Sequence, residues 1–128
     1  MLPAAWLNLR GRMTSSKAQF RLRIYRDDRI AIGPGKVQLL EAIAETGSIS
    51  AAARQLGMSY RRAWVLVDEM NSQLAQPAVR TSAGGAHGGG TGLTPVGEAI
   101  VRHYRAVEAT ARTAAAGDLA ALHRLLAP

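Results

Sequence analysis

The stretch TGSISAAARQLGMSYRRAWVLVDEMN, Thr46 to Asn71, decides the fold of this chain. It holds two segments with the apolar spacing of helices, separated by Gly57, a residue that easily adopts the left-handed backbone of a sharp turn. Ser48 or Ser50 can cap the first segment and Ser59 the second, since a serine oxygen accepts from the unpaired N–H groups that begin a helix. The stretch therefore predicts two short helices joined by a tight turn.

The second of these segments has one apolar face and one open face. Its apolar residues recur at helical spacing: Ala63, Leu66 or Val67, Met70 and Leu74. Arg61, Arg62 and Val65 fall on the other faces, and we interpret Trp64 as a packing residue. This pattern predicts that one face packs in a core while the other is free to bind.

The residues before this stretch predict a hairpin and a further helix. Apolar and polar residues alternate from Gln19 to Ile32, interrupted by Asp27-Asp28, which favours two short strands around a turn. The apolar spacing from Val37 to Ala44 predicts a helix that stops at Gly47. Residues 1–18 have no lasting period and are interpreted as a poorly ordered arm.

The residues after this stretch predict a second hairpin with a glycine-rich tip. Pro77 ends the helical region, an extended segment begins at Val79, and the run AGGAHGGGTG covers Ala83 to Gly92. Thr94 as a cap and Pro95 at the first helical position then announce another helix. We expect that helix to end at Gly117-Asp118, before a short last one.

The helix after Pro95 has an apolar seam spaced at four, three and four residues. The seam consists of Ile100, Tyr104, Val107 and Ala111. A seam of this period is typical of helices that pack against a partner helix.

Composition limits the classes of partner and of chemistry. The chain has 128 residues, room for one ordinary domain, and carries 16 Lys and Arg against nine Asp and Glu, a net charge of +7. Such an excess favours a polyanion, nucleic acid first and an anionic membrane surface second. There is no cysteine, and no apolar run approaches the ~20 residues of a membrane-spanning helix, so we expect a cytoplasmic protein.

The predicted helix that starts at Ser59 has features that suit DNA binding. A helix that starts at Ser59 can enter a major groove, where Arg61 or Arg62 can make a bidentate bond to guanine. Ser59 and Tyr60, at the positive end of the helix dipole, are better placed for phosphate oxygens. The alternative is that the two arginines form an ordinary solvated face.

The glycine run does not satisfy the nucleotide-binding motifs. No lysine follows it, and Leu93 occupies the last glycine position of G-x-G-x-x-G. A wing tip that touches phosphate or the minor groove, with Arg80 beside it, is the better use. His87, His103 and His123 are too dispersed for a metal cluster, so we expect no metal, no cofactor and no enzyme activity.

The combination of motifs resembles a known family. GSIS before the two helices, SYRRAW at the start of the second, EMN near its end, and the glycine run followed by LTPVG are together similar to the N-terminal DNA-binding domain of the ModE family. These molybdate-responsive transcription regulators are related to the LysR-type winged helices. The similarity covers roughly residues 19 to 115.

The resemblance implies a mainly α fold with a small β component: a winged helix-turn-helix with a long C-terminal dimerisation helix. It implies domains at 1–18 (arm), 19–94 (DNA-binding) and 95–128 (dimerisation), and a homodimer on a palindromic operator. DNA contacts are expected at Ser48, Ser59, Tyr60, Arg61, Arg62, Val65, Arg80, Thr81, His87 and Thr91. Dimer contacts are expected at Ile100, Tyr104, Val107 and Ala111.

Three functions follow from this reading. The first is a sequence-specific regulator of transcription, expected to repress because the chain has no evident segment to recruit polymerase. The second is a nucleoid protein that coats DNA by charge, since the residues from Met1 to Arg29 include seven Lys and Arg but two acidic residues. The third is a small-oxyanion-binding module. Members that sense molybdate carry C-terminal oxyanion-binding domains and this chain ends at Pro128, so we expect no molybdate or tungstate sensing.

Overall fold

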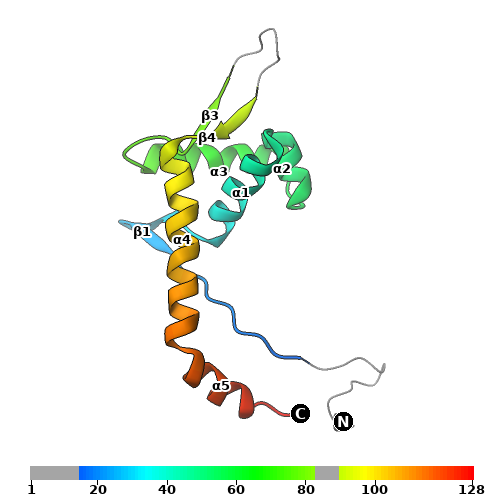
Figure 1. Ribbon diagram of the computed structural model, residues 1–128. Helices are drawn as coiled ribbons and strands as arrows, with labels where there is room; N and C mark the ends of the chain where they lie inside the picture. Colours follow the sequence, from blue (N-terminus) through cyan, green and yellow to red (C-terminus); the bar gives the residue numbers. More distant parts are fainter. Residues whose placement is uncertain (1–14, 83–89) are drawn as a thin grey trace. The chain divides into compact units, whose positions relative to one another are not determined.

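The computed structural model describes residues 15–82 and 90–128. These described residues fall into two compact units, one made of residues 21–82 and 90–107 and the other of residues 15–20 with 108–128. The elements, in chain order, are β1 Ile24–Arg26, β2 Arg29–Ile32, α1 Pro34–Thr46, α2 Ile49–Gln55, α3 Tyr60–Gln73, β3 Val79–Thr81, β4 Thr91–Leu93, α4 Pro95–Ala114 and α5 Ala116–Arg124 (Figure 1). The predicted class, mainly α with a small β component, is confirmed.

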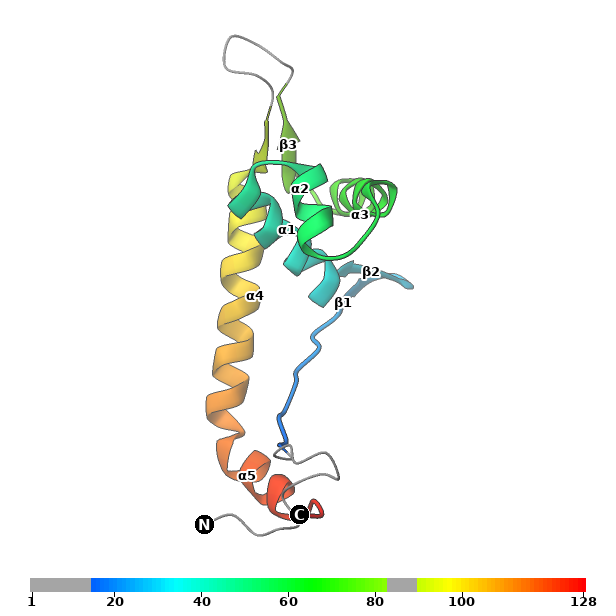
Figure 2. The same ribbon diagram turned by 90° about the vertical axis from the view of Figure 1, so that its right-hand side faces the viewer.

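The core of the larger unit lies where α1, α2 and α3 meet. Its largest fully buried side chains are Val37, Leu39, Leu40, Ile43, Val67 and Met70. Ala52, Ala53 and Ala63 are also buried, and these small side chains let α2 cross its two neighbours closely. Figure 2, which views α3 nearly end-on, shows the three helices gathered in this way.

The corner between α1 and α2 is built by two consecutive residues. Gly47 has φ +70°, in the left-handed region, and its N–H donates to Ile43 O at 2.8 Å. Ser48 then caps α2 by accepting from the N–H of Ala51 at 3.1 Å. Of the two serines that the sequence allows, the structure therefore uses Ser48.

The turn between α2 and α3 follows the sequence prediction. Gly57 has φ +68°, and Ser59 caps α3 by accepting from the N–H of Arg62 at 3.0 Å. The start of α3 is therefore fixed by a tight turn and a cap.

The second hairpin is anchored to α1 and α3. Strands β3 and β4 are antiparallel, with Val79 opposite Leu93. Asn71, near the end of α3, accepts from the N–H of Ala78 at 2.9 Å and donates to Val79 O at 3.2 Å. The N–H of Thr91 donates to the carbonyl of Gly47 at 3.0 Å, which ties β4 to the corner after α1.

The segment Leu93 to Gly97 joins this hairpin to α4. Thr94 caps α4, accepting from the N–H of Gly97 at 3.1 Å, while its hydroxyl donates to Pro77 O at 2.6 Å. A Cβ on Gly97 would lie 2.2 Å from Ala78 O, so only glycine fits there. The motif LTPVG thus fixes where α4 leaves the hairpin.

The first hairpin is shorter than its sequence pattern predicts. Strand β1 begins at Ile24 rather than near Gln19, because Ile24 already pairs with Ile32 and the next residue, Gly33, is the N-cap position of α1. The preceding residues have no strand left to pair with.

The smaller unit contains α5 and the segment from Ser15 to Phe20. The guanidinium of Arg112 lies 5.3 Å from the ring centre of Phe20 and donates to Ala18 O at 3.0 Å. The predicted break at Gly117-Asp118 is wrong: α4 ends at Ala114, and α5 includes both residues in its first turn. Asp118 lies in the first turn of α5, where its negative charge interacts favourably with the positive end of the helix dipole.

Within the described ranges, no helix is both long and apolar enough to span a membrane.

Candidate nucleic-acid interface

The exposed face of α3 has Arg61, Val65 and Asp68 near its centre. Successive helical residues are turned by about 100°, and α3 buries the face formed by Ala63, Leu66, Val67 and Met70. The three residues at the centre of the open face lie opposite that buried face, and all are exposed, Val65 to 40%. The predicted division into a packing face and an open face is confirmed.

The first turn of α3 is held by an aromatic contact. Tyr60 is 56% exposed, and its ring meets the ring of Trp64 edge to face, with 6.2 Å between centres and 87° between planes. Trp64 is partly buried and packs against the core. The exposed Tyr60 ring at the start of α3 is therefore positioned by its contact with Trp64, which packs against the core.

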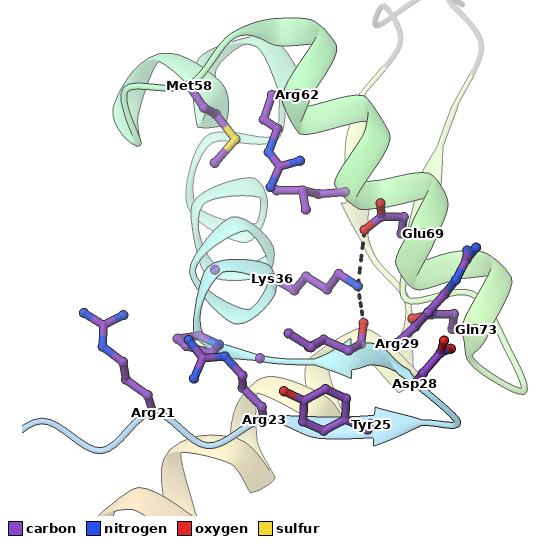
Figure 3. Close-up of a pocket in the computed structure, with 15 residues that line it drawn as sticks. Arg21, Arg23, Tyr25, Asp28, Arg29, Lys36, Met58, Arg62, Glu69 and Gln73 are labelled. Atoms are coloured by element: carbon purple, nitrogen blue, oxygen red, sulfur yellow. Dashed lines mark hydrogen bonds and ion pairs between the residues drawn. The ribbon is translucent and has the colours of Figure 1, made fainter.

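Arg62 lies on the flank of α3 and lines a groove of about 830 Å³ between α3 and the first hairpin. The hairpin side of the groove contributes Arg23, Tyr25 and Arg29, as Figure 3 shows. Five of its lining residues are cationic and two are acidic: Arg21, Arg23, Arg29, Lys36 and Arg62 against Asp28 and Glu69.

A buried lysine forms the floor of this groove. Lys36 is only 7% exposed; its Nζ donates to Ile30 O at 2.5 Å and lies 3.5 Å from Glu69 Oε2 (Figure 3). Burying a lysine is costly unless the charge is paired and hydrogen-bonded, and here both conditions are met. One side chain of α1 thereby joins β2 to α3.

The second hairpin presents Arg80 and Thr81 on β3 and Thr91 on β4. Arg80 and Thr81 are exposed, and Thr81 pairs with the half-buried Thr91. The guanidinium of Arg80 lies over Gly92, where an added Cβ would be 3.4 Å from Nη2. His87 lies outside the described residues.

Ser48 is half-buried, and its hydroxyl already serves as the cap of α2. It lies at the start of that helix, a place where a phosphate oxygen can also be bound by backbone N–H groups.

The residues predicted for dimerisation occupy different environments. Tyr104 is 3% exposed, and its hydroxyl donates to Leu22 O at 2.8 Å within the larger unit. Ile100 is partly buried against the core, whereas Val107 is 50% exposed. Ala111 is half-buried and lies in the smaller unit.

An apolar groove of about 300 Å³ runs along this part of α4. Leu22, Ile24 and Ile32 form one wall and Val107 lies on the other, with Ile24 46% exposed. The structure therefore brings residues of the seam together with the first hairpin, a pairing that the seam alone does not predict.

Among residues 15–82 and 90–128, no group of three His, Cys, Asp or Glu side chains could hold a metal ion.

Comparison with known proteins identifies the family. The model of the bacterial regulatory helix-turn-helix proteins of the LysR family matches residues 35–98, half of the chain. The chain belongs to this family. The matched region begins in α1 and includes α2, α3, both strands of the second hairpin and the start of α4.

Relatives of this LysR-family chain bear names connected with molybdenum. The molybdenum-pterin-binding protein MopB of Rhodobacter capsulatus is 53% identical over 78 residues, 61% of this chain and 29% of that protein. The molybdenum transport protein ModE of Azotobacter vinelandii is 37% identical over 125 residues, 89% of this chain and 46% of that protein. The helix-turn-helix region is thus of the ModE type. The chain spans less than half the length of these two relatives.

A solved structure supports the fold. The crystal structure of the CbnR DNA-binding domain in complex with DNA aligns with 68% of this chain and 95% of that chain, with a TM-score of 0.51 and 24% identity. The predicted winged helix-turn-helix fold is confirmed.

Sequence reasoning missed the groove beside α3. The sequence alone indicates Arg23 and Arg29 only as part of a basic arm. The signal in the sequence was the alternation of Arg21 and Arg23 with Leu22 and Ile24, which puts these two arginines on the same side of an extended segment.

Proposed function

We propose that this LysR-family regulator binds a specific DNA sequence as a homodimer, with α3 in the major groove and the second hairpin on the backbone or in the minor groove. The observation that carries the proposal is the open face of α3, which presents Arg61, Val65 and Asp68 beyond a capped and buttressed first turn. A major groove about 12 Å wide admits such a helix.

The position of each side chain on α3 suggests its role. Arg61, at the centre of the open face, suits a bidentate bond to guanine, and Asp68 on the same face can accept from the amino group of cytosine. Ser59 and Tyr60, where backbone N–H groups and the helix dipole favour anions, suit phosphate oxygens. Val65 lies between Arg61 and Asp68 on the open face and can contact a thymine methyl group.

The second hairpin would act as the wing. Arg80 and Thr81 are exposed on β3 and can reach phosphate or the minor groove, with Thr91 opposite and His87 as a further contact. Ser48 at the start of α2 would contribute a backbone contact of the same kind.

The apolar groove along α4 supports a homodimer. Val107 and Ile24 are each about half exposed on it, and a second copy of α4 would cover them. Residues 95–128 would then be the dimerisation region and residues 19–94 the DNA-binding region. Two α3 helices about one helical turn of DNA apart, ~34 Å, would bind a palindromic operator in the cytoplasm, where repression is the expected result.

The test is a titration of duplexes that the protein itself selects from a randomised pool, each compared with a shuffled version. Specific binding should exceed non-specific binding by ~10³ or more at physiological salt. Arg61→Ala should cost about 1–3 kcal/mol on the selected duplex and much less on the shuffled one. Arg102→Ala, an exposed arginine on α4, is the matched control.

The rival is a protein that coats DNA by charge, which the net charge of +7 favours. It predicts that both duplexes bind equally and weaken together as salt rises. Equal losses from Arg61→Ala on both duplexes would make that residue a phosphate contact and remove the basis for base reading.

A further inference from the structure

The groove between α3 and the first hairpin is lined by more cationic than acidic side chains. Lys36 is engaged by Glu69, so Asp28 is the acid that remains against the arginines of the lining. Arg23, Arg29 and Arg62 are all exposed there. A concave surface with such an excess attracts anions, and the planar guanidinium fork fits the oxygens of a phosphate.

The groove lies where a DNA backbone would pass. Arg62 is turned about 100° around α3 from Arg61. A helix with its side chains is about 10–12 Å wide, which is close to the width of the major groove. When Arg61 faces the base edges, the two flanks of α3 therefore face the sugar-phosphate backbones on either side of the groove. Arg62 and the groove beside it then face one of those backbones.

The hairpin is held firmly enough to position its arginines. Lys36 links Ile30 of β2 to Glu69 of α3 from a buried position on α1. Because these three elements share one ion pair and one hydrogen bond, the backbone of β2 next to Arg29 is linked to α3, the helix that carries Arg62. Such preorganisation lowers the entropy lost when both bind one ligand.

We propose that this groove binds the phosphate backbone of the same duplex that α3 reads, with Arg23, Arg29 and Arg62 as the phosphate contacts. This rests on the proposed function and adds a surface to it. Arg23 and Arg29 lie before residue 35, where the family match begins, so their contacts are additional to those of the helix-turn-helix itself. They would extend the bound DNA outward from the recognition helix.

The experiment measures duplex affinity by fluorescence anisotropy over a range of salt concentrations, for the full chain and for the double variant Arg23→Gln with Arg29→Gln. Each lost phosphate contact should lower the slope of log affinity against log salt by about 0.9, so the double variant should be less steep by about two units. The loss should be the same on the selected and the shuffled duplex. Arg102→Gln is the control for charge alone, and circular dichroism checks that each variant is folded.

A second arm titrates inorganic phosphate and follows the melting temperature. Unchanged duplex affinity and slope in the double variant would overturn the proposal while specific binding by the wild type kept the proposed function intact. Phosphate protection that the double variant loses, with duplex binding unaffected, would also overturn it and make the groove a small-anion site. If the wild type bound no duplex selectively, a reduced slope in the double variant would still support backbone binding by the groove.

Discussion

Helices α3 and α4 have similar apolar periodicity but use it differently. In α3 the apolar face is buried inside the chain, with Met70 1% and Val67 2% exposed. In α4, which is longer, the buried residues are Gly97 and Tyr104, while Val107 on the same seam remains half exposed. Helix α3 completes a core, whereas α4 keeps part of its apolar surface exposed.

The difference teaches that a helical period predicts which residues share a face but not what covers that face. On α3 the cover is α1 and α2, which precede it directly and pack closely through alanines. On α4 part of the cover comes from Leu22, which lies 82 residues earlier in the chain than Tyr104. In the proposed homodimer, substitutions along the two helices should therefore divide into those that destabilise the folded chain and those that separate its two copies.

The largest effect is expected at Met70. Met70→Ala leaves a cavity in the centre of the core and should lower the free energy of unfolding by about 2–5 kcal/mol. Chemical denaturation measures this loss. Val65→Ala on the open face is the control and should change stability by no more than about 0.5 kcal/mol. Equal losses in the two variants would mean that α3 does not bury the face assigned to it.

The next effect is expected where α4 leaves the second hairpin. Gly97→Ala would place a methyl group against the carbonyl of Ala78, and the strain should cost about 1–3 kcal/mol. Gly35→Ala is a matched control, because Gly35 is exposed in α1 and, apart from its own stretch of helix, no atom of the described residues lies within 4 Å of the added carbon. That control should be neutral or stabilising by up to about 1 kcal/mol. A tolerated Gly97→Ala would contradict the close approach of α4 to Ala78.

Much of this fold could be predicted from local chemistry. Gly47, Gly57 and Ser59 act through backbone conformation and capping, which depend on a few neighbours, so the corners and the start of α3 followed from the sequence. The choice between Ser48 and Ser50 did not, because either serine precedes a helical stretch. The groove beside Arg62 could not be predicted, since it depends on how the hairpin packs against α3.

A smaller effect is expected at the hydroxyl of Tyr104. Tyr104→Phe removes the hydrogen bond to Leu22 O but keeps the buried ring, so the cost should be about 0.5–1.5 kcal/mol. Thermal unfolding measures it, and the oligomeric state should not change. A variant that separated dimers without losing stability would place Tyr104 at the interface between copies instead of inside one.

The smallest effect on stability is expected at Val107, where the effect on association should be the largest. Val107→Glu adds a charge at a half-exposed position, so unfolding of the separated chain should change by no more than about 0.5 kcal/mol. A carboxylate in an apolar interface is costly to desolvate, so light scattering should give half the molar mass of the wild type at the same concentration. Arg102→Glu, on an exposed part of α4, controls for the added negative charge and should leave the dimer intact. If the molar mass of Val107→Glu stayed that of the wild type dimer, the apolar groove would not be the dimer contact. If the wild type were itself monomeric, the half-exposed seam of α4 would need a different partner. The difference between the buried apolar face of α3 and the exposed seam of α4 would then reflect binding of that partner instead of a second copy.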